Sequence, residues 1–82
     1  MAQGKRISAD IPDSVLAVIR EMGAAAKAAR LRAGEGQSAA AEKLGVHVQT
    51  IGRIEAGEAG VAIGHVIGLL ALYGVPLHFG FS

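Results

Sequence analysis

The chain has no cysteine among its 82 residues, so it can form neither a disulfide nor a thiolate metal site. Its three histidines and scattered carboxylates show no metal-ligand spacing. It also lacks a glycine-rich phosphate loop after a strand and any nucleophile motif. We therefore expect an intracellular protein that is not an enzyme and that needs no cofactor or metal.

Charge is scarce as well. The formal net charge is only +1, and residues 59–82 contain no Asp, Glu, Lys or Arg. Residues 1–32 are locally basic, with six Lys or Arg against three acids. This balance is weak support for nucleic-acid binding. Affinity for DNA would have to come from a local basic face, and more strongly from two such faces in a dimer.

No apolar run is long enough to cross a bilayer. The most apolar stretch, residues 59–75, is shorter than the ~20 residues that a membrane helix needs, and it contains His65 and four glycines. A secretory signal is not expected either, because two basic residues near the start are followed by acids and a proline before any apolar run. We expect a cytoplasmic protein with no membrane partner.

Residues 37–57 predict two short helices joined by a tight turn. Apolar residues recur at helical spacing in both segments, and Gly45 between them can adopt the left-handed conformation that ends a helix. Such a pair fits a helix-turn-helix, whose second helix enters the major groove of DNA, and it also fits an ordinary helical hairpin. The inward-facing residues are Ala40, Ala41 and Leu44, then Val48, Ile51 and Ile54.

The residues themselves go further than the spacing, because they resemble the lambda-repressor-like (Xre) helix-turn-helix family. The resemblance implies an all-α fold of five to six short helices in one domain, residues 12–82, with the motif at about 37–56. It also implies a sequence-specific regulator of transcription that binds duplex DNA, most simply as a homodimeric autorepressor. The matching residues are Met22, Gly23, Arg30, Gly34, Gln37, Ala41, Glu42, Lys43, Leu44, Gly45, Val46, Thr50, Ile51, Arg53, Ile54, Glu55, Gly57, Ile63, Val66, Ile67, Leu70, Gly74 and Val75.

The N-terminal part departs from that family. We expect a flexible arm at residues 1–11, then a helix that starts at Pro12 and is additional to the five-helix core. This helix either breaks at Gly23 or runs through it. The following helix, about 22–33, and the next one have alanines (Ala26, Ala29 and Ala40) where the family has large aliphatic residues. The core is therefore thin, and we expect the extra helix or a second subunit to supply the missing packing.

The C-terminal part, about 62–82, favours dimerisation. A helix at about 62–73 is apolar on every side, and such a helix should be buried all round. Residues 75–82 alternate as a half-buried strand does, which predicts a short strand that pairs across a dimer; the alternative is a disordered tail. The residues expected at the dimer interface are Val66, Leu69, Leu72, Leu77, Phe79 and Phe81.

Family positions that face base edges correspond here to Val48, Gln49, Gly52 and Arg53. Glutamine can pair with adenine, arginine with guanine, and valine can meet a thymine methyl group. The alternatives are solvated surface for Gln49 and Arg53, and packing for Val48. The resemblance also implies that Gln37 and Thr50 contact the sugar-phosphate backbone of DNA. His47 contacts phosphate or a base, unless it is only solvated. Arg30 and Glu55 are implied to form a structural salt bridge.

Within the family, residues 57–64 and the apolar segment after them look like the antitoxin partners of HipA-type kinase toxins. Those proteins repress their own operon and hold the toxin, so a HipA-like toxin is a further expected partner. A stand-alone repressor is the nearest alternative. A protein-interaction module that has kept the fold and lost DNA binding is the other; Gly36, Gly52 and the low net charge favour it.

Overall fold

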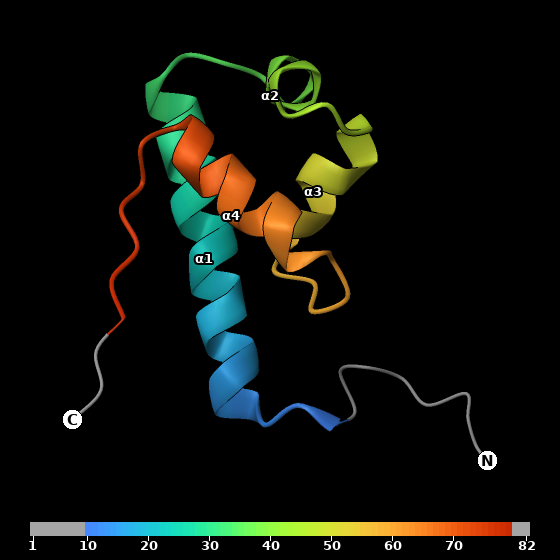
Figure 1. The fold of residues 1–82 in the computed structure, drawn as a ribbon, viewed down its shortest axis with the longest axis vertical. Coiled ribbons are helices and arrows are strands. Elements are labelled where there is room, and N and C mark those ends of the chain that lie inside the picture. Colours follow the sequence, from blue (N-terminus) through green and yellow to red (C-terminus); the bar gives the residue numbers. More distant parts are fainter. Residues whose placement is uncertain (1–9, 80–82) are drawn as a thin grey trace.

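Four α-helices make up the computed structural model, which describes residues 10–79 (Figure 1). No strand occurs within that range. The all-α class is confirmed, and the expected helix-turn-helix motif corresponds to the second and third helices. The helices are α1 (Asp13–Arg32), α2 (Gln37–Leu44), α3 (Val48–Ala56) and α4 (Ile63–Leu72).

The expected count of five to six helices is wrong, because the two helices predicted between residues 12 and 33 are one. α1 runs through Gly23 without a break. This glycine serves close packing: a Cβ there would overlap the carbonyl oxygen of Ile54 and lie 2.9 Å from that of Glu55. The last turn of α3 therefore rests directly on the backbone of α1.

A second glycine lies at the same crossing. Gly57, which ends α3, has a φ of 78°, a left-handed conformation that favours glycine. A Cβ at this position would lie 2.7 Å from the Cα of Arg20. The end of α3 is thus fixed against α1 by two close backbone approaches, three residues apart along α1.

Alanines occupy much of the core. Ala26 and Ala40 are completely buried, and Ala29 and Ala41 are nearly so. Among residues 10–79, the large side chains that are less than 2% exposed are Ile51, Leu69 and Leu70, and Ile54 follows at 2%. The thin core expected from the sequence is present, and its small side chains let the helices pack closely.

The predicted dimer interface is partly wrong. Val66 and Leu69 are 7% and 0% exposed because they pack into the core of their own chain, so they leave little or no surface for a second subunit. Leu77 is half-buried against the same core. Leu72 and Phe79 are exposed, and Phe81 lies outside the described residues.

The predicted C-terminal strand is also not found in the part of it that is described. Residues 75–79 have no regular structure. Val75 and Leu77 are half-buried against the core, so this segment packs as an irregular tail of α4. A single extended segment has no partner strand within the described chain, and an unpaired strand is not stable alone.

The first half of α1 extends past the other helices (Figure 1). Val15 and Val18 are 45% and 52% exposed, and the side of α1 that packs against the core begins at Met22. Within the described residues, the N-terminal segment therefore does not supply the packing that the thin core lacks. The predicted arm, residues 1–11, falls outside the described residues except for its last two positions.

Replacing Gly23 with Ala tests the close crossing. Alanine normally stabilises a helix interior relative to glycine, but here the methyl group would force α1 and α3 apart. We expect Gly23→Ala to lower the free energy of unfolding by about 1–3 kcal/mol in urea titrations. The matched control is Gly64→Ala in α4, where an added Cβ meets nothing within 4 Å and stability should hold or rise. Equal stability of the two variants would contradict the crossing.

Candidate nucleic-acid interface

α3 presents a polar outer side. Ile51 and Ile54 are 0% and 2% exposed and fix the inner side of the helix against the core. Gln49 and Arg53, four residues apart on the outer side, are both exposed. Val48 is 39% exposed, so it is available to a ligand as well as to packing.

The turn before α3 follows the expected pattern. Gly45 ends α2 with a φ of 79°, and the amides of Gly45 and Val46 both donate to the carbonyl oxygen of Ala41, at 2.9 and 3.0 Å. His47 is extended and exposed, and no side chain caps the start of α3 or of α2. The first amides of both helices are therefore left to water or an anion.

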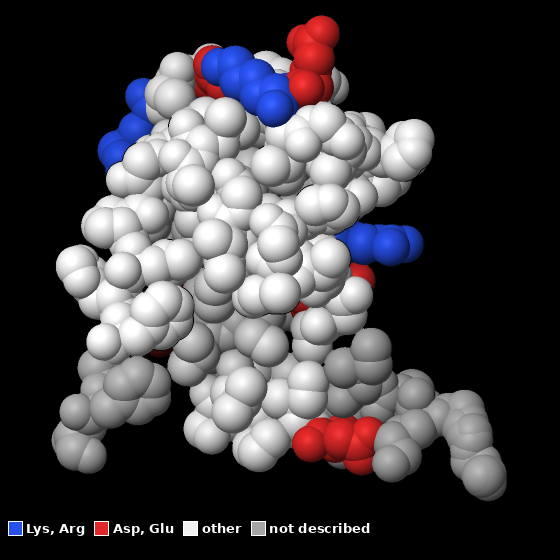
Figure 2. All heavy atoms as spheres, in the orientation of Figure 1, with Lys and Arg blue, Asp and Glu red and all other residues white. Residues whose placement is uncertain are grey.

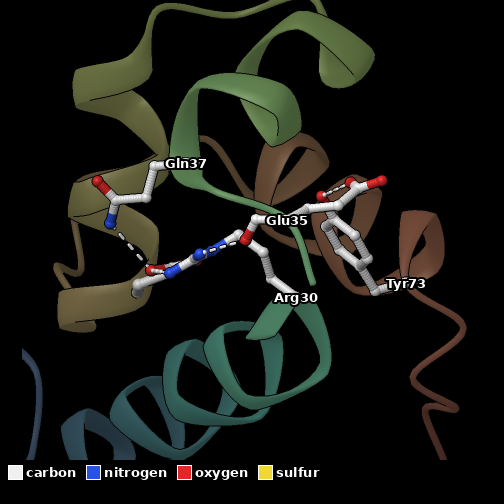
Figure 3. A network of polar contacts seen from close by, with 5 residues as sticks. Arg30, Glu35, Gln37 and Tyr73 are labelled. Atoms are coloured by element: carbon white, nitrogen blue, oxygen red, sulfur yellow. Dashed lines mark hydrogen bonds and ion pairs between the residues drawn. The ribbon is translucent and has the colours of Figure 1, made fainter. Parts of the chain in front are cut away.

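Arg30 of α1, labelled in Figure 3, pairs with Glu55 at the end of α3. The Arg30 Nε donates to Glu55 Oε2 at 2.6 Å and its Nη2 donates to Oε1 at 3.0 Å, a two-point contact between α1 and the last turn of α3. Both side chains are almost fully buried. The contact fixes the direction in which the outer side of α3 faces.

Both groups stay charged in this contact. Burial alone would raise the pKa of Glu55, but the hydrogen bonds from Arg30 and Gln37 outweigh it and hold that pKa below its ordinary value. The hydrogen bond to Glu55 also raises the pKa of Arg30. A buried charged pair of this kind is expensive to break, because either partner alone would be left without compensation.

Comparison with protein families decides the class. The family described as a helix-turn-helix domain matches residues 21–78, well over half of the chain. The chain belongs to the helix-turn-helix family, in its Xre or lambda-repressor-like form. Neither the curated proteins nor the solved structures gave a match. Membership indicates a DNA-binding regulator and a family that is typically non-enzymatic.

The side chain of Gln37 makes a contact within the protein that the family resemblance did not imply. Its Nε2 donates to Glu55 Oε1 at 3.0 Å, and the residue is half-buried. In this helix-turn-helix domain Gln37 therefore joins the start of α2 to the Arg30–Glu55 pair. A phosphate contact by the side chain of Gln37 stays a prediction. The uncapped backbone amides at the start of α2 are more open to a phosphate than this side chain is.

A second polar network was not predicted from the sequence. Tyr73, just after α4, donates to Glu35 Oε1 at 2.7 Å, and Lys43 of α2 pairs with the same carboxylate. The Nη1 of Arg30 donates to the carbonyl oxygen of Glu35 at 2.7 Å. The network ties the loop between α1 and α2 to α4. The one signal in the sequence was a tyrosine at the end of an apolar helix, whose hydroxyl needs a partner.

The pKa values of the acceptor Glu35 and the donor Tyr73 shift in opposite directions. The hydrogen bond from Lys43 is the main reason that the pKa of Glu35 lies below its ordinary value. Burial, followed by the hydrogen bond to Glu35, raises the pKa of Tyr73 to about 12. Tyr73 is therefore a neutral donor to a charged acceptor at any pH at which DNA binding would be measured.

One face of the domain is poor in charge. Figure 2 shows a face whose centre, over α4 and the first half of α1, carries almost no Lys, Arg, Asp or Glu, with charged side chains at its rim. α4 itself contains none of these residues. The centre of this face therefore offers few charged side chains to a phosphate backbone.

Within residues 10–79, no cluster of three or more His, Cys, Asp or Glu could hold a metal ion. In the same range, no helix has the length and apolar character needed to span a membrane.

Removing Glu55 tests the role of the buried pair. Glu55→Ala leaves the Arg30 cation buried without a negatively charged partner, so we expect the free energy of unfolding to fall by about 3–5 kcal/mol, or the domain to fail to fold. Glu58→Ala, an exposed acid just after α3, is the matched control and should change stability little. Similar small effects of both variants would contradict the account.

The same pair predicts a pH dependence. Because the pKa of Glu55 is lowered in the folded state, its contribution to stability is complete above the ordinary glutamate pKa of about 4.3 and is lost as the pH falls through the folded value. The difference in unfolding free energy between wild type and Glu55→Gln should therefore shrink below about pH 4. A difference that is constant from pH 7 to pH 3 would contradict the charged state assigned to Glu55.

Proposed function

We propose that this helix-turn-helix protein is a sequence-specific regulator of transcription that binds duplex DNA as a homodimer and represses its own operon. The observation that carries the proposal is the exposed pair Gln49 and Arg53 on the outer side of α3. Behind that side, the Arg30–Glu55 contact keeps the helix in a fixed direction. Two side chains that match adenine and guanine therefore project from a rigid support.

The neighbouring residues have supporting roles in this proposal. Val48 meets a thymine methyl group, and His47 and Thr50 contact phosphate at the start of α3, where the helix amides are uncapped. Thr50 is half-buried and His47 is exposed, so His47 reaches further from the domain.

The homodimer is proposed from exposed apolar surface and from weak charge. Val15 and Val18 on α1, and Ile63 and Ile67 on α4, are between 38% and 64% exposed, and the surface that includes these helices is charge-poor (Figure 2). A second copy of the chain fits such a surface, since it brings an equally uncharged one and doubles the number of DNA contacts. The proposed interface therefore contains these four residues and no longer includes Val66 and Leu69.

DNA binding is tested by selecting bound fragments from a random duplex pool. We expect a two-fold symmetric site whose half-sites are about one helical turn apart. Gln49→Ala and Arg53→Ala should each lose about 1–3 kcal/mol of discrimination at one base pair per half-site. Arg32→Ala, which removes the same charge from the exposed end of α1, is the matched control and should leave base preference unchanged.

The outcomes separate the alternatives. Affinity that falls steeply with salt supports phosphate contacts. No binding to any duplex at low salt would contradict the proposal and favour the interaction module. Loss of base preference in Arg32→Ala, with none in Arg53→Ala, would place the DNA surface elsewhere on the domain.

The dimer is tested by sedimentation equilibrium of the whole chain. We expect a dimer for wild type and a folded monomer for Val18→Glu, because a charge in the centre of an apolar contact is not compensated. Ala24→Glu is the matched control: Ala24 is exposed on the other side of α1, and the dimer should persist. A monomeric wild type, or a dimer unaffected by Val18→Glu, would contradict the proposed interface.

A second proposal is the antitoxin role. It is supported by residues 57–64, which resemble the antitoxins of HipA-type toxins, and by the exposure of Ile63 within that segment, which is 64%. The test is co-expression with the product of the adjacent open reading frame. Co-purification of a kinase-like toxin that Ile63→Glu abolishes and Val18→Glu preserves would support it, because both residues lie in the proposed dimer interface and only Ile63 lies in the antitoxin-like segment. An adjacent gene that encodes no such protein would leave the stand-alone repressor.

A further inference from the structure

Gly52 is a glycine that the fold does not need. It lies in the middle of α3 with a φ outside the left-handed region, and a Cβ added to it would meet nothing within 4 Å among the described residues. Two other helical glycines are explained by packing, since Gly23 lies against α3 and a Cβ on Gly68 would lie 3.0 Å from Leu44 Cδ1. Glycine in a helix interior is destabilising relative to alanine. The fold therefore gives no reason for this one.

The position of Gly52 gives the reason. It follows Gln49 by three residues and directly precedes Arg53, so it lies on the flank of the outer side of α3. Ala56, one turn later on the same flank, is also small and exposed. The backbone of α3 therefore carries no side chain at Gly52, beside the two polar side chains that the proposed function assigns to base recognition.

We propose that Gly52 sets how closely α3 approaches duplex DNA. In this inference, which rests on the proposed function, a base edge or sugar lies in van der Waals contact with the bare helix backbone at Gly52. A methyl group would project about 1.5 Å from the Cα and would hold the helix away by a similar distance. Hydrogen bonds tolerate no such change, because the donor and acceptor atoms must lie about 2.7–3.2 Å apart.

The short side chain of Gln49 is the group most sensitive to this distance. Arg53 has a longer and more flexible reach and can follow a small shift of the helix. Gly52 is therefore a positioning residue, and its replacement should weaken recognition at the base pair read by Gln49 more than at the one read by Arg53. A role in helix stability alone predicts no such difference between base pairs.

The experiment compares Gly52→Ala with Gly64→Ala in the full chain, using the duplex site selected with wild type. Both alanines replace glycines with open space around them, so both should raise the melting temperature by roughly 2–8 °C. Gly52→Ala should bind the selected duplex about tenfold more weakly or worse, with most of the lost discrimination at the Gln49 base pair. Gly64→Ala should bind as wild type does, and sedimentation should give both variants the same mass.

The outcomes distinguish this inference from the proposed function. If Gly52→Ala is more stable than wild type and binds the duplex with the same affinity, the role of Gly52 is overturned and the DNA-binding proposal stands. An equal loss of affinity in Gly64→Ala would also overturn it, since the loss would not be specific to α3. Failure of wild type to bind any duplex would overturn both.

Discussion

The orientation of α3 depends on one buried ionic contact, the fork between Arg30 and Glu55. It joins the C-terminal half of α1 to the last turn of α3, and Gln37 adds a hydrogen bond from the start of α2. Four of the nine buried apolar residues in the described chain are alanines, so apolar packing alone offers few large side chains to fix a helix rotation. The directional Arg30–Glu55 contact therefore fixes the rotation of α3, which the small core side chains alone would fix poorly. With that rotation fixed, the outer residues of α3 face solvent.

Glycine has two opposite uses in this domain. At Gly23 and Gly57 the missing side chain lets the backbones of α1 and α3 approach, so these glycines serve the fold. At Gly52 the missing side chain leaves space that nothing in the described chain fills. The apolar surface shows a similar division: one side of α4 is buried in the core, and the other, with Val15 and Val18 of α1, remains exposed.

The motif at residues 37–56 was predictable because its signals are local: helical spacing of apolar residues, and a glycine at the turn. The continuity of α1 was not predictable, since a glycine inside a helix is compatible with a break or with a close helix crossing. Only the packing of Ile54 against Gly23 in the folded chain shows that the glycine serves a crossing. Val66 and Leu69 were assigned to a dimer because a uniformly apolar helix does not reveal its inner side. The contact of Tyr73 with Glu35 spans 38 residues and left no periodic signal.

The central claim is that the outer side of α3, held by the Arg30–Glu55 contact, is the surface that meets duplex DNA. The most direct measurement is NMR titration of the labelled full chain with a short duplex that carries the selected site. The account predicts that the largest amide shifts fall on residues 47–53 and the start of α2, with small ones on the outer side of α4. Shifts concentrated on α4 and the first half of α1, with α3 unaffected, would contradict it.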